Sequence, residues 1–462
     1  MRFRYLPASL LRLSTIKEMT KSGSFSSCPA MEKSPYLNNS ELIAPLSIRM
    51  CKNPNSDDLN HQVYSVLKEI IPAFLEQYQI EMSSQLNVQT LSGGLSNHLL
   101  TVRPGKVEED PIELKKSDDN AAPNTILIRI HDADGDEKSG EEEFSLVDRA
   151  QENKVSAMLS KYDLAPAFYG RFLNGRLEEF YEDIRPLSHS EMGCYTCTGN
   201  ENDITREWDG KYNGFTIELA KKLSKLHQLD LENNEDQKLG EIWLRIDEWI
   251  KMARQLNAND DDNNDKAIEQ MLDLLEREWS WLRAEIGPEK KVVLDDSCQS
   301  DAIRYSRDIV FAHMDCQSLN ILTPKSRCEK SDEIAIIDYE YAGYNPRAAD
   351  IGNSFAEFCD MNNLIPDYEN EYPSDSCQNI FLSTYIRSND SDLAKKLDDS
   401  QEWGQFLHVM RDEVGKHSLL SHLGWACWSL IQLKTSSIDF DYLRYAQIRV
   451  DGYLLFKAKH WP

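Results

Sequence analysis

Apolar residues recur three and four positions apart from residue 57 to residue 78, a spacing that predicts an amphipathic helix. The face that this helix would bury is formed by Val63, Val66, Leu67, Ile70, Ile71 and Phe74. Asp57 or Asp58 is available to cap its start. The pattern then changes, because residues 87–104 and 124–133 are rich in strand-forming residues and predict two strands joined by a charged, exposed loop.

A helix over residues 146–162 and a hairpin over residues 166–180 follow. The dipeptide at Asn174 and Gly175 marks the turn of this hairpin, because Asn-Gly suits the tight turns that join antiparallel strands. We therefore expect a small mixed N-terminal lobe with an antiparallel sheet over residues 56–185.

Beyond Arg185 the pattern is mostly helical. Apolar residues at i, i+3 and i+4 predict helices over residues 217–229, 241–256 and 265–286. The strand-like interruption of this region runs from residue 308 to residue 338 and predicts a short hairpin with a polar insert. The whole pattern predicts an α+β protein of two lobes, the larger and mainly helical one over residues 186–462.

Composition narrows the functions open to such a chain. Its 78 acidic and 51 basic residues give a net charge of −27, which opposes binding to nucleic acid or to an anionic membrane surface. Apolar stretches stay below the roughly 18 residues of a membrane-spanning helix, so we expect no integral membrane segment. A reducing compartment suits the ten cysteines. Cys194 and Cys197 are expected to be free thiols, because no second pair completes a zinc site.

Residues 1–55 are expected to lie outside the fold. The beginning of the chain is rich in Arg, Leu and Ser and has no acidic residue before Glu18. A disordered tail and an organelle transit segment share this composition, and both remain open. Without a transit signal, the expected location is the cytoplasm.

The candidate chemistry lies in the strand-like interruption. His313, Asp315 and Asn320 fall within FAHMDCQSLNIL, and Asp338 ends the second strand of the predicted hairpin. Phosphoryl transfer requires a carboxylate that deprotonates a hydroxyl, and hard oxygen ligands for Mg²⁺. Asp315 is the candidate base, and Asn320 and Asp338 are the candidate metal ligands; the step of five residues also occurs in protein kinases. His313 and Asp350 are expected to support the loop backbone.

A second stretch, IIDYEYAGYNPRAADIGNSFAEF at residues 336–358, follows directly. Together the two stretches resemble the choline and ethanolamine kinase family, in which HNDxxxxN and IDYEYAGYN...DIGNHFxEF have this order and spacing. The resemblance implies a two-lobed, protein-kinase-like fold and transfer of the ATP γ-phosphate to a small amino alcohol, the first step toward phospholipid head groups. ATP and Mg²⁺ are then the expected cofactors, and a homodimer is left open.

The resemblance also implies a nucleotide site. The segment Leu91–Leu99 resembles the family's ATP loop, in which glycines let backbone N–H groups approach phosphates. Arg129 stands where the family has its nucleotide-contacting cation, and Glu152 could pair with it. Residues 176–180 resemble the hinge that meets adenine. Taken singly, each feature also has a structural explanation. The glycines could form a hairpin turn, Arg129 and Glu152 an exposed ion pair, and residues 176–180 the edge of a strand. The expected nucleotide-binding residues are Gly93, Gly94, Leu95, Ser96, Asn97, Arg129, Glu152, Glu179, Phe180 and Gln317.

The segment from residue 421 to residue 453 resembles the family's C-terminal segment. Trp425 and Trp428 are three apart on a predicted helix, and Tyr445 follows. Core packing explains such aromatic residues, but they can also hold an ammonium group, since each cation–π contact contributes roughly 0.5 to 2 kcal/mol. With the resemblance we expect a substrate site, with Glu357 as counter-charge. Its expected members are Glu340, Tyr341, Glu357, Trp425, Trp428 and Tyr445.

Three positions depart from the family pattern. Met314 replaces an asparagine whose amide would stiffen the loop, and Ser354 replaces a histidine. Asn362 stands where choline-binding members have an aromatic residue, which argues against a quaternary ammonium substrate. The three candidate residues for chemistry are unchanged, so we do not expect a pseudokinase.

Ethanolamine kinase is the leading hypothesis, because residues 275–286, 367–373 and 438–446 look like ethanolamine kinases. Gln317 looks more like choline kinases, so a choline kinase or a dual kinase is the alternative. Phosphorylation of another small hydroxyl compound, as in aminoglycoside phosphotransferases, is a further one. A catalytically inactive scaffold that binds a partner through its acidic loops represents a different class.

Overall fold

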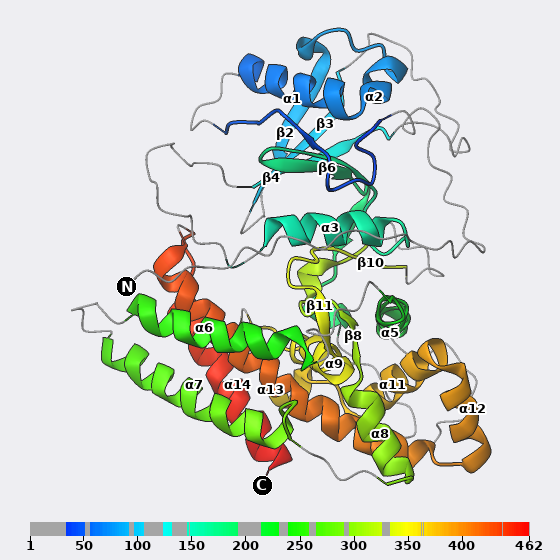
Figure 1. The fold of residues 1–462 in the computed structure, drawn as a ribbon, viewed down its shortest axis with the longest axis vertical. Coiled ribbons are helices and arrows are strands. Elements are labelled where there is room, and N and C mark those ends of the chain that lie inside the picture. Colours follow the sequence, from blue (N-terminus) through cyan, green and yellow to red (C-terminus); the bar gives the residue numbers. More distant parts are fainter. Residues whose placement is uncertain are drawn as a thin grey trace.

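The computed structural model of the protein has a small lobe with a β-sheet, which lies above a larger helical lobe in the view of Figure 1. It describes residues 34–50, 56–91, 97–105, 123–131, 146, 148–192, 214–230, 239–257, 265–290, 295–325, 333–361, 363, 365–436 and 438–461. The predicted order of a small mixed lobe followed by a mainly helical lobe is confirmed.

The small lobe is organised around a six-stranded sheet. Its strands in spatial order are β1 (Ile43–Ala44), β5 (Phe168–Phe172), β6 (Gly175–Glu179), β4 (Ile126–His131), β3 (Asn97–Pro104) and β2 (Leu86–Leu91). Neighbouring strands are antiparallel except β1 and β5, which are parallel. The helices α1 (Ser56–Ile70) and α2 (Pro72–Gln77) share an apolar core with the strands. A short 3-10 turn, η1 (Ser83–Gln85), leads from α2 into β2.

The hairpin of β5 and β6 turns where the sequence predicts. Phe172 pairs with Gly175 across it, and a side chain at Gly175 would collide with the carbonyl oxygen of Arg129 on the neighbouring strand. The side chain of Asn174 donates to the carbonyl oxygen of Ile48 (2.8 Å) and accepts from its N–H (3.0 Å). The turn therefore also anchors the N-terminal segment.

Residues 34–50 belong to the small lobe, which corrects the expectation that residues 1–55 lie outside the fold. β1 extends the sheet, and Ala44 and Ile48 are fully buried in the core of the small lobe. β1 is two residues long, too short to show a strand period. Its place in the sheet depends on contacts with residues more than 100 positions away.

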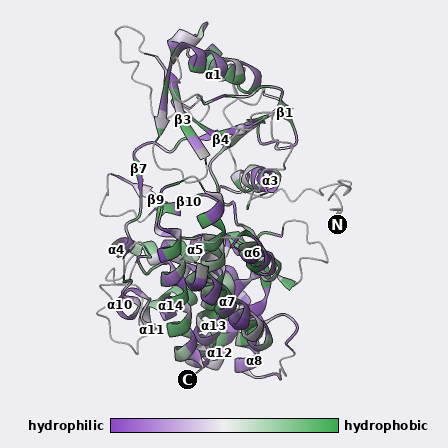
Figure 2. Ribbon diagram, turned by 90° about the vertical axis from the view of Figure 1, so that its left-hand side faces the viewer, coloured by the Kyte–Doolittle hydropathy of each residue, from purple (hydrophilic) through white to green (hydrophobic). Residues whose placement is uncertain are grey.

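The large lobe is built around one long helix, α13 (Trp403–Thr435), which packs against several others. The other helices are α4 (His189–Met192), α5 (Gly214–His227), α6 (Glu241–Asn257), α7 (Asp265–Ile286), α8 (Cys298–Arg307), α9 (Arg347–Ala356), α10 (Tyr368–Glu371), α11 (Asp375–Asn389), α12 (Ser391–Ser400) and α14 (Tyr442–His460). Figure 2 shows that these helices carry both hydrophobic and hydrophilic residues, as amphipathic helices around a shared core do. The predicted helices over 217–229, 241–256 and 265–286 are confirmed as α5, α6 and α7.

Two small sheets follow, one at the junction of the lobes and one packed against α5, α6 and α9 of the large lobe. β7 (Ile184–Pro186), β9 (Ile321–Pro324) and β10 (Ala335–Ile336) form one, and β8 (Ile309–Ala312) pairs with β11 (Gly343–Pro346) in the other. The predicted hairpin is the pair β9 and β10, and β11 was not predicted. A 3-10 turn, η3 (Ser318–Asn320), precedes β9. This arrangement brings the end of β8 close to the end of β10.

The helix α3 (Arg149–Ser160) connects the two lobes. It runs between the sheet and the helical lobe in Figure 1. Its residues Val155 and Leu159 pack into the core of the large lobe, although the helix lies within the small lobe's stretch of chain.

The described part of the chain contains no helix long and apolar enough to cross a membrane. Of the described cysteines, Cys298, Cys316, Cys359 and Cys427 are free. Cys377 is disulfide-bonded. This bond was not expected, because a reducing compartment was predicted and disulfides are rare there. Cys194 and Cys197 lie outside the described residues.

Candidate active site

The loop after β8 is held by a carboxylate on α9. One oxygen of Asp350 accepts from the N–H of His313 (2.9 Å), and the other accepts from the N–H of Met314 (2.7 Å). The ring of His313 lies 3.0 Å from the carbonyl oxygen of Ile337 and accepts from the N–H of Asp315 (3.1 Å). Both expected supports of the loop, His313 and Asp350, are therefore confirmed as backbone anchors.

Two further residues behind Asp350 were missed in the sequence. His227 on α5 lies 2.8 Å from an Asp350 oxygen, and its other ring nitrogen lies 2.7 Å from the hydroxyl of Tyr385 on α11. Burial opposes ionisation of Asp350, but its hydrogen bond with His227, the charges of His227 and His313 and the N–H of His313 together outweigh burial and lower the pKa of Asp350. The loop is thus tied to two helices of the large lobe.

Met314 explains how the loop keeps its shape without the family's asparagine. Its φ is +66°, in the left-handed region that disfavours side chains. The N–H bond to Asp350 holds the backbone there, and the methionine side chain is buried in the core of the large lobe. Rigidity therefore comes from the backbone contact, so the side-chain amide is not required.

Asp315, Asn320 and Asp338 are brought together by the hairpin. The Asn320 amide donates to an Asp315 side-chain oxygen (2.8 Å) and to the Asp315 carbonyl oxygen (2.9 Å). The N–H of Ile337, next to Asp338, donates to the carbonyl oxygen of Asn320 (2.9 Å). The three side chains predicted for chemistry therefore meet at one place between the lobes.

Carboxylates gather around Asp315. Burial first, and then the negative charges of Glu357, Asp338 and Glu340, raise the pKa of Asp315 well above its usual value. Asp315 and Asp338 form no ion pair with a protein cation among the described residues. The site therefore has unbalanced negative charge, which suits cationic ligands.

The residues present fit Mg²⁺. One side-chain oxygen of Asp338 is buried and has no hydrogen-bond partner among the described residues, so it is free to bind a cation. The Asn320 N–H groups are used by Asp315, which leaves the amide oxygen as a ligand atom. No three His, Cys, Asp or Glu residues of the described chain form a complete metal cage. Mg²⁺ at phosphate sites needs none, because waters and phosphates supply its other ligands.

A pocket of about 830 Å³ lies between the lobes. Predicted nucleotide residues Arg129, Glu179 and Phe180 line it, together with Asp338. Burial raises the pKa of Glu179, whose side chain accepts from the N–H of Ala167 (3.0 Å). The predicted hinge thus faces the pocket, where it can meet an adenine.

Other predicted nucleotide residues lie elsewhere. The N–H of Gln317 donates to the Asp315 carbonyl oxygen (2.9 Å), so Gln317 lies beside the catalytic loop. Glu152 is fully enclosed on α3. The ATP loop at Gly93, Gly94, Leu95 and Ser96, the side chain of Asn97, and Asn362 lie outside the described residues.

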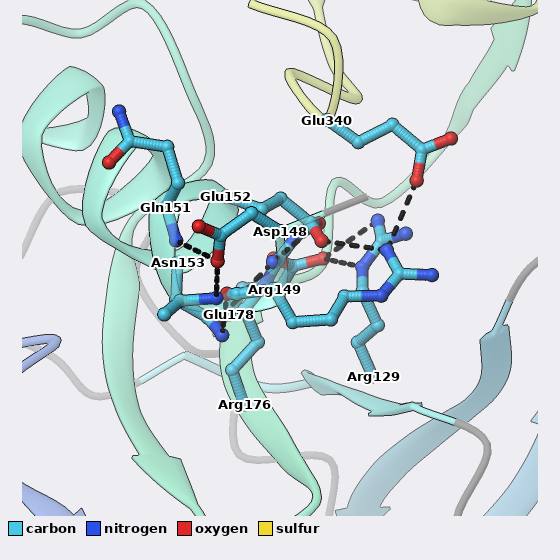
Figure 3. Close-up of polar contacts among 10 residues, drawn as sticks. Arg129, Asp148, Arg149, Gln151, Glu152, Asn153, Arg176, Glu178 and Glu340 are labelled. Carbon is cyan, nitrogen blue, oxygen red and sulfur yellow. Dashed lines mark hydrogen bonds and ion pairs between the residues drawn. The ribbon is translucent and has the colours of Figure 1, made fainter. Parts of the chain in front are cut away.

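The expected pair of Arg129 and Glu152 does not form, which is a correction. Arg129 on β4 instead donates to Glu178 (3.1 and 3.2 Å), and Glu152 accepts from Arg176 (2.7 Å) and Arg149 (2.8 Å). The reason is register, because Arg129 and Arg176 are directly opposed on β4 and β6. Arg176, which the sequence reading overlooked, takes the partner expected for Arg129 (Figure 3).

Glu152 gives a stability prediction. Burial would raise its pKa, but Arg176 and then Arg149 outweigh burial and lower the pKa of Glu152 from 4.5 to about 2. A depressed folded-state pKa contributes stability above pH 4.5 that is lost as pH falls toward 2, here about 3 kcal/mol. Urea unfolding of wild type and Glu152→Gln should therefore differ by about 3 kcal/mol near neutral pH and by progressively less in acid. A difference that stayed constant down to about pH 3 would show that Glu152 is not ionised in the fold.

The predicted aromatic residues form a continuous wall. Tyr341 and Trp425 have ring centres 5.1 Å apart, Trp425 and Trp428 5.5 Å, and Trp428 and Tyr445 6.5 Å. Trp249 on α6, which was missed, packs against both Tyr341 and Trp425. Part of this wall lines a second, small cavity of about 20 Å³. The spacing of the aromatic residues is thus compatible with both packing and a cation site.

The two glutamates predicted for the substrate already have arginine partners. Glu357 accepts from Arg449 on α14 (2.5 Å), and Arg449 also donates to the hydroxyl of Tyr445 (2.5 and 3.1 Å). Glu340 accepts from Arg149 (3.1 Å). Neither arginine was predicted, although Arg449 follows Tyr445 by four residues, the spacing of neighbours on one helix face.

Comparison with known proteins gives one consistent result. The family described as Choline/ethanolamine kinase matches residues 88–200 and 203–454. "Probable choline kinase 2" of Arabidopsis thaliana is 27% identical over 410 residues, 88% of this chain and 95% of that protein. "Probable ethanolamine kinase A" of Dictyostelium discoideum is 25% identical over 416 residues, 87% of this chain and 97% of that protein.

Solved structures show the same fold. The choline kinase of Cryptosporidium parvum has a TM-score of 0.59 at 24% identity and covers 86% of this chain and 95% of that one. The ethanolamine kinase of Plasmodium vivax has a TM-score of 0.57 at 22% identity, with 90% of this chain and 100% of that one covered. At this identity the likeness concerns the two-lobed, kinase-like fold.

Proposed function

The chain belongs to the choline/ethanolamine kinase family, and on this premise we propose that its preferred acceptor is ethanolamine, which it converts to phosphoethanolamine. Members of the family are small-molecule phosphotransferases that use ATP and have an alcohol acceptor. The observation that carries the proposal is the convergence of Asp315, Asn320 and Asp338 beside a pocket between the lobes.

The roles of the residues follow from their contacts. Asn320 orients Asp315 by donating to one of its side-chain oxygens, and the Asp315 carboxylate would accept the proton of the acceptor hydroxyl. The alcohol oxygen forms a bond to the γ-phosphorus of ATP while the bond from that phosphorus to the β,γ-bridging oxygen breaks, and ADP leaves. Mg²⁺ held by Asn320 and Asp338 would neutralise charge on the phosphate oxygens.

A positively charged acceptor also favours the ionised form of Asp315, which is the form that can accept a proton. Burial and then the surrounding carboxylates raise the pKa of Asp315, which favours the protonated acid. An ammonium group nearby has the opposite effect, because an opposite charge within a few ångströms stabilises the carboxylate. An ammonium group held by the aromatic wall would lie near Asp315, because Asp315 acts on the pKa of both Tyr341 and Tyr445.

Two observations favour ethanolamine over choline. The face of Tyr445 is partly occupied, because the guanidinium of Arg449 lies 5.0 Å from the ring centre. A trimethylammonium group requires open aromatic faces, whereas a primary ammonium donates three hydrogen bonds and can use carboxylate oxygens. Glu357 offers such an oxygen next to the aromatic wall, because Arg449 holds only one of its two.

The test compares the two acceptors directly. With purified protein, ATP and Mg²⁺, we expect kcat/KM for ethanolamine to exceed that for choline by about 10-fold, since a site with unmet acceptors discriminates against a ligand without donors. A preference for choline would reverse the assignment, and equal values would show a dual kinase. No turnover of either acceptor above background would support an inactive scaffold. A homodimer and a cytoplasmic location remain predictions.

A further inference from the structure

A chain of alternating charges links the two lobes (Figure 3). Its members, in order of contact, are Arg129, Glu178, Arg176, Glu152, Arg149 and Glu340. Each neighbouring pair is joined by N–O distances between 2.7 and 3.2 Å. Three arginines and three glutamates cancel in formal charge, so the chain can lie inside the protein without net charge.

The two ends of this chain lie at different parts of the active site. Arg129, Arg176 and Glu178, on strands of the small lobe, line the nucleotide pocket between the lobes. Glu340, in the large lobe, follows Asp338 by two residues and precedes Tyr341 of the aromatic wall. The chain of contacts therefore connects the wall of the nucleotide pocket with the segment that presents the metal ligand and the acceptor site.

Arg149 is the member that crosses from one lobe to the other. A single nitrogen, Nη1, donates both to Glu152 on α3 (2.8 Å) and to Glu340 after β10 (3.1 Å). Two ion pairs between described residues join the small lobe to the large lobe. One is the pair of Arg149 with Glu340, and the other is the pair of Arg185 with Glu191, which lies at the boundary between the lobes and only six residues apart in sequence. Glu152 is itself fixed to β6 through Arg176. The segment after β10 is thus attached, through Arg149, to the sheet of the small lobe.

We propose that Arg149 is a positioning residue for phosphoryl transfer, which holds residues 338–341 against α3 and so sets the placement of the acceptor site relative to the nucleotide pocket. The kinetic part of this inference rests on the proposed function. The structural part, that Arg149 holds residues 338–341 in place, does not depend on the proposed function, because the contact is between two side chains of the protein.

A role in folding alone is the competing explanation. The Arg149 side chain is 26% exposed, but its partners Glu340 and Glu152 are only 12% and 1% exposed. Loss of Arg149 therefore removes one partner of a buried carboxylate and is expected to lower stability. The start of α3 is secured without Arg149, since Asp148 accepts from the N–H groups of Ala150 and Gln151. Glu152 keeps its bond to Arg176 when Arg149 is lost, so the protein should remain folded, with a lower melting temperature, and the effect on placement must be read from exchange and kcat.

The experiment compares Arg149→Met, Arg149→Lys and a matched control, Arg304→Met. Arg304 also binds a carboxylate three residues away, Asp301 (2.8 Å), and a second acceptor, the Asp295 carbonyl oxygen (2.7 Å), but within the large lobe. The readouts are kcat with the acceptor that wild type prefers, the melting temperature, and hydrogen–deuterium exchange of the amides of Ile337 and Ala342. Both amides are hydrogen-bonded and flank residues 338–341.

We expect Arg149→Met to lower kcat about 10-fold and to speed exchange at both amides while it remains folded at the assay temperature, although its melting temperature should be lower than that of Arg304→Met. Arg149→Lys should restore part of the rate, and Arg304→Met should match wild type in kcat and exchange. Wild-type exchange or wild-type kcat in Arg149→Met would overturn the inference. If wild type phosphorylates neither acceptor, the proposed function fails, and the exchange data alone decide whether Arg149 holds the segment.

Discussion

Asp315→Asn is expected to lower kcat for phosphorylation of the amino alcohol by roughly 100-fold or more, the usual scale for loss of a positioned base. An amide cannot accept the hydroxyl proton, yet it has the same shape and can still bond to Asn320. Burial of an amide is also easier than burial of a carboxylate, and Asp315 is buried among carboxylates. The variant should therefore fold at least as well as wild type and bind ATP with similar affinity.

The matched control is Asp308→Asn, which makes the same chemical change just before β8. Asp308 is exposed and lies 3.6 Å from Arg347, away from the catalytic loop. Its kcat should stay within about twofold of wild type, because surface substitutions have small effects. Near-wild-type turnover by Asp315→Asn, with ATP affinity unchanged, would show that another group takes the proton.

Asp338→Ala should raise the Mg²⁺ concentration needed for half-maximal rate by roughly 100-fold or more. Changes to groups that merely support a metal ligand already cost 10- to 100-fold in affinity or activity, and Asp338 is predicted to be a ligand itself. Its buried, unpartnered oxygen is the structural basis of this expectation. A titration of rate against Mg²⁺ at saturating ATP measures the effect.

Asp338→Asn separates the metal from the backbone. The φ of Asp338 is +67°, a conformation that asparagine tolerates better than alanine does. If the metal explanation holds, both variants require more Mg²⁺, because both lose the negative charge. If only Asp338→Ala is impaired, the cause is backbone strain and Asp338 is not a metal ligand.

Much of the fold could be predicted from patterns among residues close in sequence. The turn at Asn174 and the helices α5, α6 and α7 depend on interactions between residues close in sequence, so they leave a period or a turn signal. β1 leaves none, because two residues show no period and their partners on β5 lie far along the chain. The same limit explains why β11 was not predicted.

In the candidate site, too, residues close in sequence could be predicted, whereas contacts between distant residues could not. Asp315 and Asn320 are five residues apart, and a single hairpin adds Asp338, so their spacing was visible in the sequence. The partners of the charged residues were not. Glu357 binds Arg449 across 92 residues, and which arginine Glu152 binds depends on the register of β4 and β6.

The most direct measurement of the central claim is ³¹P NMR of purified protein incubated with ATP, Mg²⁺ and ethanolamine. We expect a phosphomonoester of ethanolamine to appear in step with ADP, and its formation to stop when EDTA removes the metal. Loss of ATP with release of inorganic phosphate alone, or no phosphoethanolamine or phosphocholine with either acceptor, would contradict it.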